Sequence, residues 1–396
     1  MRLSEQVLKM QHSPIRKFTP IAKKAEEAGK KVYYLNIGQP DIETPPCFME
    51  AIRNFDEKVI AYADSRGVDV LLDSVSGYFK SYGMDYEKEH ILVTNGGSEA
   101  LSMIFAALMN PGENIVVPEP YYTNYSAFMD VYGAKISPVT TSPEEGYFFA
   151  DAARIEAAIT PETKAIALPA PGNPTGAVLT MDDIRLICQI AEKHDLWIIA
   201  DEVYREFVYD GREMTSFGML PEYADRVIII DSVSKRYSAC GARVGLIITK
   251  NEELMDNLMK IARSRLCTPT LEQIGAASLF QLPHSYYEEV RKEYEARRDA
   301  AYEEISKIPG VVCRKPGGSF YLMAKLPVDN VENFLLFLLN DFEHNGETVM
   351  FTPAEGFYET EGLGTEEIRI AYVLNAKDMA RSAELIRLGI EAYNNR

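Results

Sequence analysis

Short apolar runs of strand length recur along the chain from about residue 91, and stretches with helical character lie between them. Seven runs have this character, namely HILVT, ENIVVPE, AKISPVT, TKAIALPAP, DLWIIAD, RVIIIDS and RVGLIIT. The stretches between them include GSEALSMIFAALM and TMDDIRLICQIAEKH, which are amphipathic. This alternation predicts an α/β fold in which helices pack on a largely parallel sheet.

The pattern changes after about Pro283. A long, charged helical stretch over residues 285–306, SYYEEVRKEYEARRDAAYEEIS, leads into VVCRKPGGSFYLMAKL and then into more helical sequence. No linker rich in glycine or serine marks the junction. The change of pattern predicts a second, smaller α+β domain.

The composition narrows the classes of partner. The chain has 396 residues, 46% of them hydrophobic, so it can bury a large core. The 41 basic and 59 acidic residues leave a net charge of −18. Nucleic acids and anionic membranes are bound by basic surfaces, so this charge argues against both. The partners that we expect are small molecules or copies of the same chain.

The cysteines and the amino-terminal residues indicate the cellular compartment that we expect for the protein. The five cysteines are odd in number, far apart and never arranged as C-x-x-C; they are residues 47, 188, 240, 267 and 313. This usage indicates neither a disulfide framework nor a metal site, and Cys188 is expected in the core. No apolar run precedes a small-residue cleavage site, and no apolar stretch approaches bilayer length. We therefore expect a cytoplasmic protein.

Polar motifs follow the predicted strands, at the sheet edge where open α/β sheets place their ligands. After HILVT comes NGGSEAL, in which two glycines permit a tight turn and Ser98 and Glu99 open a helix. The free amides of such a helix start suit a phosphate; the alternative is an ordinary turn with a serine cap. No G-x-x-x-x-G-K-[ST] occurs, and no G-x-G-x-x-G follows a strand, which argues against nucleoside triphosphates and dinucleotides.

Two further strands end in polar residues. ALPAPGNPTGAV places Asn173 in a turn built of proline and glycine, which holds the amide over a ligand or serves only as a turn. WIIADEVYREF leads an apolar strand directly into Asp201. A buried carboxylate there requires a cation or strong donors, whereas the alternative is a surface aspartate that caps a helix.

The next strand, RVIIID, leads into SVSKRYSACGARVG. This stretch puts Lys235 in a small polar turn with Ser232 and Ser234, and Arg243 follows eight positions later. A surface lysine is the default interpretation of any lysine. Partial burial and cationic neighbours activate amines as nucleophiles, so the position after a strand favours a Schiff-base lysine.

Taken together, these motifs resemble the class I and II pyridoxal-phosphate aminotransferases of fold type I. The resemblance is carried by YLNIGQPDIETP, NGGSEAL, PEPYYTNY, PGNPTG, ADEVYREF, SVSKRYSACGARVG and EIRIAYV, in the family's order over nearly the whole chain. It implies a large domain with a mostly parallel seven-stranded sheet between helices, and a smaller α+β domain. The boundaries that we expect are 46–285 for the large, cofactor-binding domain, and 1–45 with 286–396 for the small one.

The resemblance also implies roles at the cofactor ring. Lys235 would carry pyridoxal 5′-phosphate as a Schiff base and then shuttle a proton at the substrate. Asp201 would pair with the pyridine nitrogen, and Asn173 and Tyr204 would bind the phenolate oxygen. Tyr122 would stack on the ring, at a position where the family often has tryptophan. The predicted catalytic set is Lys235, Asp201 and Tyr204.

The resemblance implies further contacts at the phosphate and the substrate. The phosphate would be held by Gly97, Ser98, Ser232 and Arg243, with Tyr62 reaching in from the partner of a homodimer. The predicted substrate-binding residues are Gly38, Asn173 and Arg369. Arg369 would clamp the α-carboxylate; the alternative is an arginine on the surface of an edge strand.

The function implied is transfer of an amino group from an L-amino acid to a 2-oxo acid by ping-pong chemistry. The segment SPIRKF points to the aspartate or aromatic subgroup, so aspartate, glutamate or an aromatic amino acid is the expected donor. For a dicarboxylate, the candidate second cations are Arg16, Arg66 and Arg265. The alternatives are a carbon–sulfur β-lyase or a decarboxylase with the same cofactor. A non-catalytic cofactor-binding regulator is disfavoured by the absence of a helix-turn-helix and by the charge.

Overall fold

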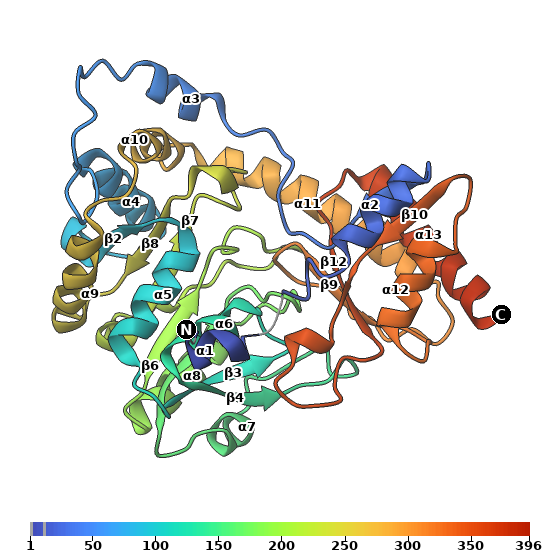
Figure 1. Cartoon of the computed structure of the whole chain (residues 1–396). Coiled ribbons are helices and arrows are strands. Elements are labelled where there is room, and N and C mark those ends of the chain that lie inside the picture. Colours follow the sequence, from blue (N-terminus) through green and yellow to red (C-terminus); the bar gives the residue numbers. More distant parts are fainter. Residues whose placement is uncertain (1–2, 11–12) are drawn as a thin grey trace.

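The computed structural model describes residues 3–10 and 13–396, and within them a seven-stranded sheet forms the centre of the molecule (Figure 1). Its order is β2-β8-β7-β6-β5-β3-β4. Adjacent strands run parallel except at β8, which is antiparallel to both of its neighbours. The strands are β2 (Ile91–Thr94), β3 (Asn114–Glu119), β4 (Lys135–Thr140), β5 (Thr163–Pro169), β6 (Trp197–Asp201), β7 (Val227–Ser232) and β8 (Gly245–Ile248). Each coincides with one of the seven predicted apolar runs.

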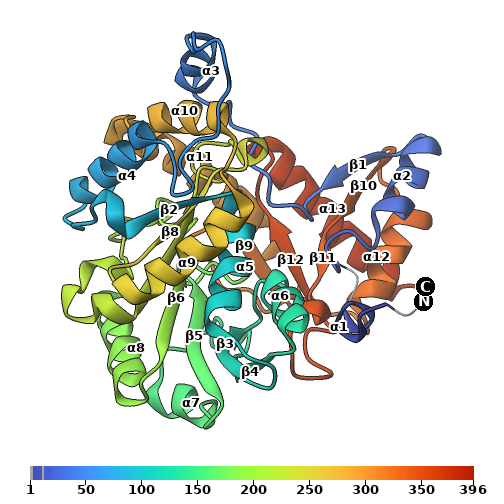
Figure 2. The same ribbon diagram turned by 60° about the vertical axis from the view of Figure 1, so that its left-hand side comes forward.

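Helices cover both faces of this sheet (Figure 2). One face packs against α5 (Gly96–Leu108), α6 (Asn124–Tyr132) and α9 (Glu252–Arg265). The other packs against α4 (Asp69–Ser81), α8 (Met181–Lys193) and α10 (Thr270–Leu279). Successive strand residues point to opposite faces, so Ile229 joins the second hydrophobic cluster while Ile228 and Ile230 join the first. Cys188 is fully buried in α8, as expected, and burial raises the pKa of its thiol to about 12.

The remaining strands belong to smaller sheets. β9 (Tyr321–Lys325), β11 (Thr352–Pro353) and β12 (Glu367–Ala371) pair antiparallel in the order β11-β12-β9. β1 (Lys31–Tyr34) pairs parallel with β10 (Glu347–Met350), so the amino-terminal segment lies beside the carboxyl-terminal elements (Figures 1 and 2). The helices of this part are α2 (Thr19–Glu27), α11 (His284–Ile305), α12 (Val331–Asn340) and α13 (Ala376–Asn394). The predicted fold class and the long helix after Pro283 are confirmed.

The domain boundaries at residues 45 and 285 stay predictions, and residues 1–2 and 11–12 lie outside the described part of the chain. The other helices are α1 (Glu5–Lys9), α3 (Pro46–Arg53) and α7 (Ala152–Ala157). Short 3₁₀ helices lie at Lys88–His90, Phe217–Met219, Pro221–Arg226, Cys240–Ala242 and Glu355–Phe357. None of the helices described is both long and apolar enough to cross a bilayer.

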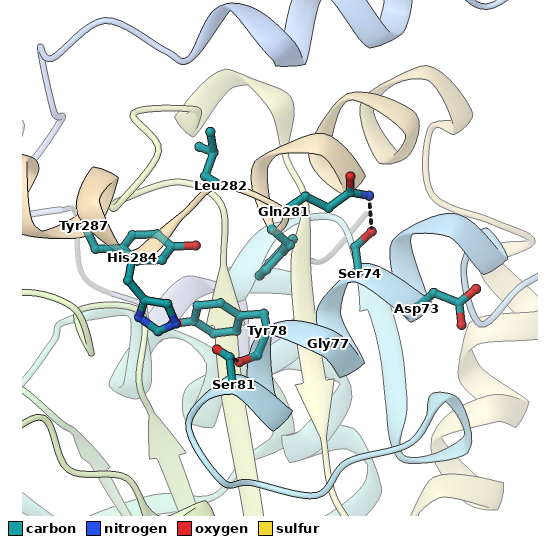
Figure 3. A pocket seen from close by; sticks show the side chains of 10 residues that line it. Asp73, Ser74, Gly77, Tyr78, Ser81, Gln281, Leu282, His284 and Tyr287 are labelled. Carbon is teal, nitrogen blue, oxygen red and sulfur yellow. Dashed lines mark hydrogen bonds between the residues drawn. The ribbon is translucent and has the colours of Figure 1, made fainter.

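A hollow of about 420 Å³ lies between α4 and the junction of α10 and α11 (Figure 3). Aromatic rings form much of its wall, with Tyr78, Phe280 and Tyr287 packed edge to face and His284 beside Tyr287. Gln281 donates to the Ser74 hydroxyl at 3.0 Å. None of the predicted site residues lines this hollow. Two of its wall residues bond to residues outside the hollow: the Tyr78 hydroxyl donates to Glu206, and the Tyr287 hydroxyl lies 2.8 Å from that of Tyr237.

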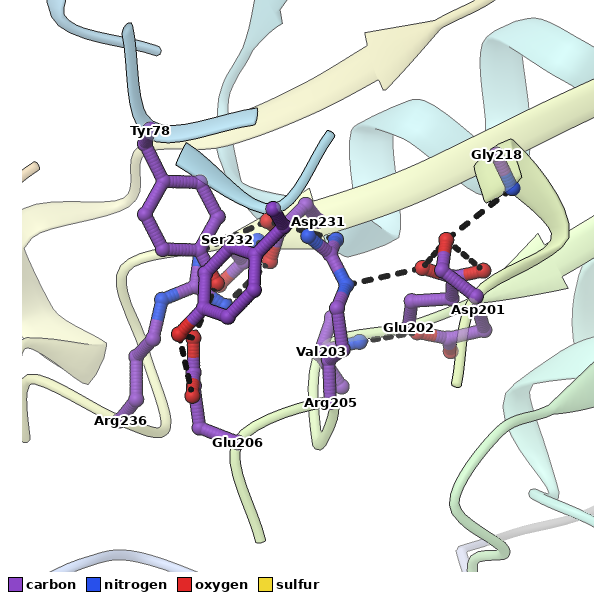
Figure 4. A network of polar contacts seen from close by, with 12 residues as sticks. Tyr78, Asp201, Glu202, Val203, Arg205, Glu206, Gly218, Asp231, Ser232 and Arg236 are labelled. Atoms are coloured by element: carbon purple, nitrogen blue, oxygen red, sulfur yellow. Dashed lines mark hydrogen bonds and ion pairs between the residues drawn. The ribbon is translucent and has the colours of Figure 1, made fainter. Parts of the chain in front are cut away.

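A network of buried charges lies beneath the ends of β6 and β7 (Figure 4). Asp231 accepts two hydrogen bonds from Arg236, at 2.9 and 2.6 Å, and one from Arg205 at 3.1 Å. Arg205 also donates to Glu202 at 2.8 Å, and the backbone amide of Ser232 donates to Asp231 at 2.7 Å. Two arginines and two carboxylates therefore balance one another in the interior. The network holds the turn that begins at Ser232.

The replacement Asp231→Asn should destabilise the protein by about 3–5 kcal/mol, because it leaves two buried guanidinium groups with one carboxylate partner. The measurement is urea unfolding of the variant and the wild type. The matched control is Glu156→Gln, which breaks the exposed Lys193–Glu156 pair at 2.7 Å and should cost less than about 1 kcal/mol. Equal losses of unfolding free energy in the two variants would show that the buried network stabilises the protein no more than an exposed ion pair does.

Candidate active site

One cavity of about 630 Å³ gathers the predicted site residues at the carboxyl ends of β5, β6 and β7. Every predicted residue except Tyr62 lines it: Gly38, Gly97, Ser98, Tyr122, Asn173, Asp201, Tyr204, Ser232, Lys235, Arg243 and Arg369. The parallel register of these strands places Pro169 opposite Asp201, and Asp201 opposite Ile230. Segments distant in sequence are thereby brought to one edge of the sheet. Tyr62 is 80% exposed and does not line the cavity of its own chain.

Asp201 ends β6 and is buried against the cavity. Its carboxylate accepts long hydrogen bonds, at 3.4 Å each, from the Tyr125 hydroxyl and the Val203 amide. Within the described residues no lysine or arginine forms an ion pair with it. Burial therefore raises the pKa of Asp201 to about 7. The alternative of a surface aspartate capping a helix is wrong, and the carboxylate is ready to accept a cationic partner.

Lys235 lies half-buried in the turn after β7. Its Nζ donates to the Gly38 carbonyl oxygen at 2.9 Å, and it lies 5.9 and 5.6 Å from the ring centres of Tyr204 and Phe320. It forms no ion pair with any carboxylate of the described residues, so its amine is held by one backbone carbonyl inside the cavity. The default interpretation as a surface lysine does not describe this position.

The start of α5 and Arg243 lie together at one end of the cavity. Asn95 is the residue before the helix and makes no side-chain cap, so the serine-cap alternative is wrong and the amides of Gly97 and Ser98 are not used by a cap. Gly96 has a φ of +78°, and a Cβ there would come within 2.3 Å of the Arg243 guanidinium. This close approach brings the arginine, the helix start and the Ser232 hydroxyl to one place, which suits a phosphate.

Arg369 lies in β12 and is 1% exposed, so the interpretation as a surface arginine is wrong. It donates to the Asn173 side-chain oxygen at 3.3 Å and to the Asn36 carbonyl at 2.7 Å, and its Nε has no partner among the described atoms. Its guanidinium lies 4.5 Å from the Tyr321 ring centre. Burial lowers the pKa of this guanidinium. A buried arginine with donors to spare fits a substrate carboxylate.

Two tyrosines that the motifs did not single out also belong to the site. The Tyr321 hydroxyl lies 3.1 Å from that of Tyr204, and Tyr125 contacts Asp201. Gly38 adjoins Tyr321 so closely that a Cβ on the glycine would lie 1.8 Å from its hydroxyl oxygen. Tyr125 stands in the quoted motif PEPYYTNY, whereas only its position after the double glycine of PGGSFY could have drawn attention to Tyr321.

The donors of the cavity fit pyridoxal 5′-phosphate. The phosphate matches Arg243 and the helix start, a cationic ring nitrogen matches the unpaired Asp201 carboxylate, and an aldehyde matches Lys235. The observation that supports this fit most directly is the buried carboxylate without a cation, because a charge buried in that way requires a partner.

Comparisons with known proteins agree with this chemistry. The family Aminotransferase class I and II matches residues 30–386. Aspartate aminotransferase of Bacillus subtilis is 28% identical over the full length of both chains, and the putative aminotransferase YugH of that species is 34% identical over 81% of this chain and 82% of its own. The solved structure of alanine aminotransferase from Pyrococcus furiosus is 31% identical, covers both chains fully and has a TM-score of 0.89.

These names do not favour the β-lyase or decarboxylase alternative, and the match extends over both the large sheet and the carboxyl-terminal elements. Members of this family use pyridoxal phosphate. The chain belongs to the class I and II aminotransferases and is a pyridoxal-phosphate-dependent transaminase, which moves an amino group between an L-amino acid and a 2-oxo acid.

Proposed function

We propose that Lys235, Asp201 and Tyr204 are the catalytic residues of this transaminase, acting in a cavity shared by two subunits. When bound, the cofactor supplies an electron sink for bonds broken at the substrate Cα. Lys235 would hold the cofactor covalently, and its amine, once free, would act as the base that takes the proton from the substrate Cα. The Gly38 carbonyl, 2.9 Å from Nζ, supports this proposal because it fixes the amine on one side of the cavity.

The remaining residues bind and orient. Asp201 would pair with the ring nitrogen, and the Tyr204 hydroxyl and the Asn173 amide would donate to the phenolate oxygen. Tyr122 would pack on the ring face. Arg243, Ser232, Gly97 and Ser98 hold the phosphate, while Arg369 binds the substrate α-carboxylate beside Gly38 and Asn173. Asparagine at 173 suits both tasks because its oxygen accepts from Arg369 at 3.3 Å, which leaves its amide hydrogens free for the ring.

We propose a homodimer in which Tyr62 completes the partner's phosphate site. Tyr62, Val59 and Ile60 are 80%, 72% and 63% exposed, and an apolar segment of this kind is typical of an interface. The segment is held beside the α9–α10 junction, since Thr270 donates to the Ala61 carbonyl at 3.4 Å and Arg265 to the Ser65 carbonyl at 3.5 Å. Leu266 in that junction is 51% exposed and extends the apolar surface.

We also propose that the enzyme works in the cytoplasm on an aspartate, glutamate or aromatic donor. The cysteines at positions 47, 188, 240, 267 and 313 are all free thiols, which agrees with a reducing compartment. The aspartate aminotransferases among the relatives support a donor of this kind, and the alanine aminotransferase shows that the fold also accepts others.

Replacing Lys235 with alanine should remove covalent cofactor attachment and abolish transamination, because no other lysine lines the described cavity. The measurement is the visible spectrum, followed by borohydride treatment and mass spectrometry of the peptides. Lys260→Ala, at an exposed lysine, is the control and should retain both properties. Cofactor fixed to another lysine in the Lys235→Ala protein would refute the assignment.

Asp201 should make the cofactor-free protein less stable as the pH rises. Its folded pKa of about 7 lies above its ordinary value of 3.8, so between these values the folded state binds a proton that the unfolded state releases. The free energy of unfolding should therefore fall by roughly 2–3 kcal/mol between pH 5 and 7.5. In the Asp201→Asn variant this fall in the free energy of unfolding should be absent when urea unfolding at pH 5 and at pH 7.5 is compared. The same pH dependence in variant and wild type would show that Asp201 is already ionised.

Subunit complementation tests the shared site. The Lys235→Ala and Tyr62→Ala chains should each be impaired alone, whereas their hybrid dimer contains one site with a native Lys235 and a native Tyr62 from the other chain. Random pairing of equal amounts should therefore restore about one quarter of wild-type activity. A mixture no more active than the average of the two parents would show that Tyr62 serves its own chain or neither site.

A further inference from the structure

The cavity contains a cation without an assigned partner. Among the described residues that line it, four side chains are cationic and one is acidic: Arg16, Lys235, Arg243 and Arg369 against Asp201. In the proposed function Lys235 carries the cofactor, Arg243 binds its phosphate and Arg369 binds the α-carboxylate. Arg16 remains. Its guanidinium forms no ion pair and no side-chain hydrogen bond with any residue that the structure describes.

The backbone that carries Arg16 is fixed against the cavity wall. The Asn36 amide donates to the Ile15 carbonyl at 2.9 Å, and Lys17 pairs with Glu332 at 2.7 Å. Phe18 is buried in the first hydrophobic cluster. Pro14 packs so closely on Gly356 that a Cβ on the glycine would lie 2.9 Å from the proline ring. Arg16 therefore projects from an anchored segment and not from a loose tail.

The same anchor connects Arg16 to the α-carboxylate site. Asn36 donates to Ile15 through its side chain, while its carbonyl oxygen accepts from Arg369 at 2.7 Å. Asn36 thus positions both the buried Arg369 and the segment that carries Arg16. A ligand with two carboxylates would meet two cations whose separation is set through Asn36.

The other two candidate arginines are engaged elsewhere in the chain. Arg66 donates to the carbonyls of Glu89 and Ile91 at 2.7 and 3.3 Å, and it does not line the cavity. Arg265 donates to the Val93 carbonyl at 3.2 Å and lies 3.7 Å from Glu99. It does not line the cavity either.

We propose that Arg16 binds the side-chain carboxylate of the substrate, so that the enzyme is specific for amino dicarboxylates of four or five carbons and the matching 2-oxo dicarboxylates. This inference rests on the proposed function and selects aspartate or glutamate over an aromatic donor. A phosphate, an α-carboxylate and a second carboxylate together match the cationic groups of the cavity. An aromatic side chain would leave Arg16 without an anionic partner.

The test is the Arg16→Met variant of the cofactor-loaded enzyme. Its single half-reaction is followed by the loss of the visible cofactor band with aspartate, glutamate, alanine and phenylalanine in turn. The kcat/KM for the two dicarboxylates should fall roughly 10- to 100-fold, the value of one charge-assisted pair, mainly through KM. The values for alanine and phenylalanine should change less than about 2-fold. Binding of maleate, a dicarboxylate without an amino group, should weaken to a similar extent in calorimetry.

Matched variants separate the outcomes. Lys23→Met removes a nearby exposed charge of α2 that takes no part in the anchor and should leave the selectivity unchanged, whereas Arg369→Lys should weaken all four substrates together. Arg16→Glu should lower dicarboxylate turnover further, since it replaces attraction with repulsion. Equal losses for all four amino acids in Arg16→Met, or a selective loss in Arg66→Met instead, would overturn the role of Arg16. A wild-type enzyme that converts none of the four would contradict the proposed function itself.

Discussion

The site depends on charges that the fold buries without giving them partners. Desolvation raises the pKa of Asp201 to about 7, and Arg369 is buried with its Nε unbonded. Both groups oppose folding of the empty chain, because burial disfavours an ion that lacks a counter-charge. The apolar packing on both faces of the seven-stranded sheet must offset that cost. In the proposed function a bound cofactor and substrate would supply the missing charges, so the same groups that weaken the empty protein would favour binding.

Neighbouring carboxylates at the end of β6 have opposite tasks. Asp201 faces the cavity and lacks a cation, whereas Glu202 is satisfied by Arg205, Ser216 and the Phe217 amide. Consecutive residues of a strand point to opposite sides, so one strand end supplies both a ligand group and a structural one. Through Arg205 the structural side reaches Asp231, which holds the turn leading to Lys235. The rigid network therefore supports the part of the site that must remain reactive.

The charge of the whole chain and the charge of the cavity differ in sign. The chain has a net charge of −18, yet among the described residues that line the cavity four side chains are cationic and one is acidic. Surface charges are screened over about 8 Å at physiological ionic strength, while partly buried charges are screened much less. Small anionic ligands thus respond to the lining of the cavity and not to the sum over the chain. The overall composition therefore gives no guide to the charge of the substrates.

The sequence by itself determined the strands, the long helix after Pro283 and the residues that follow each strand, because strand patterning and strand-end motifs are local properties. Only the tertiary structure decided which distant residues meet. Lys235 contacts Gly38 across 197 positions, and Arg369 contacts Asn36 across 333. Tyr321 lies outside the motifs quoted for the site and joins it through Tyr204. Arg16, Arg66 and Arg265 are equivalent in sequence terms. Of the three, the path of the chain brings only Arg16 to the cavity of its own chain, because contacts between remote segments depend on packing and have no local pattern.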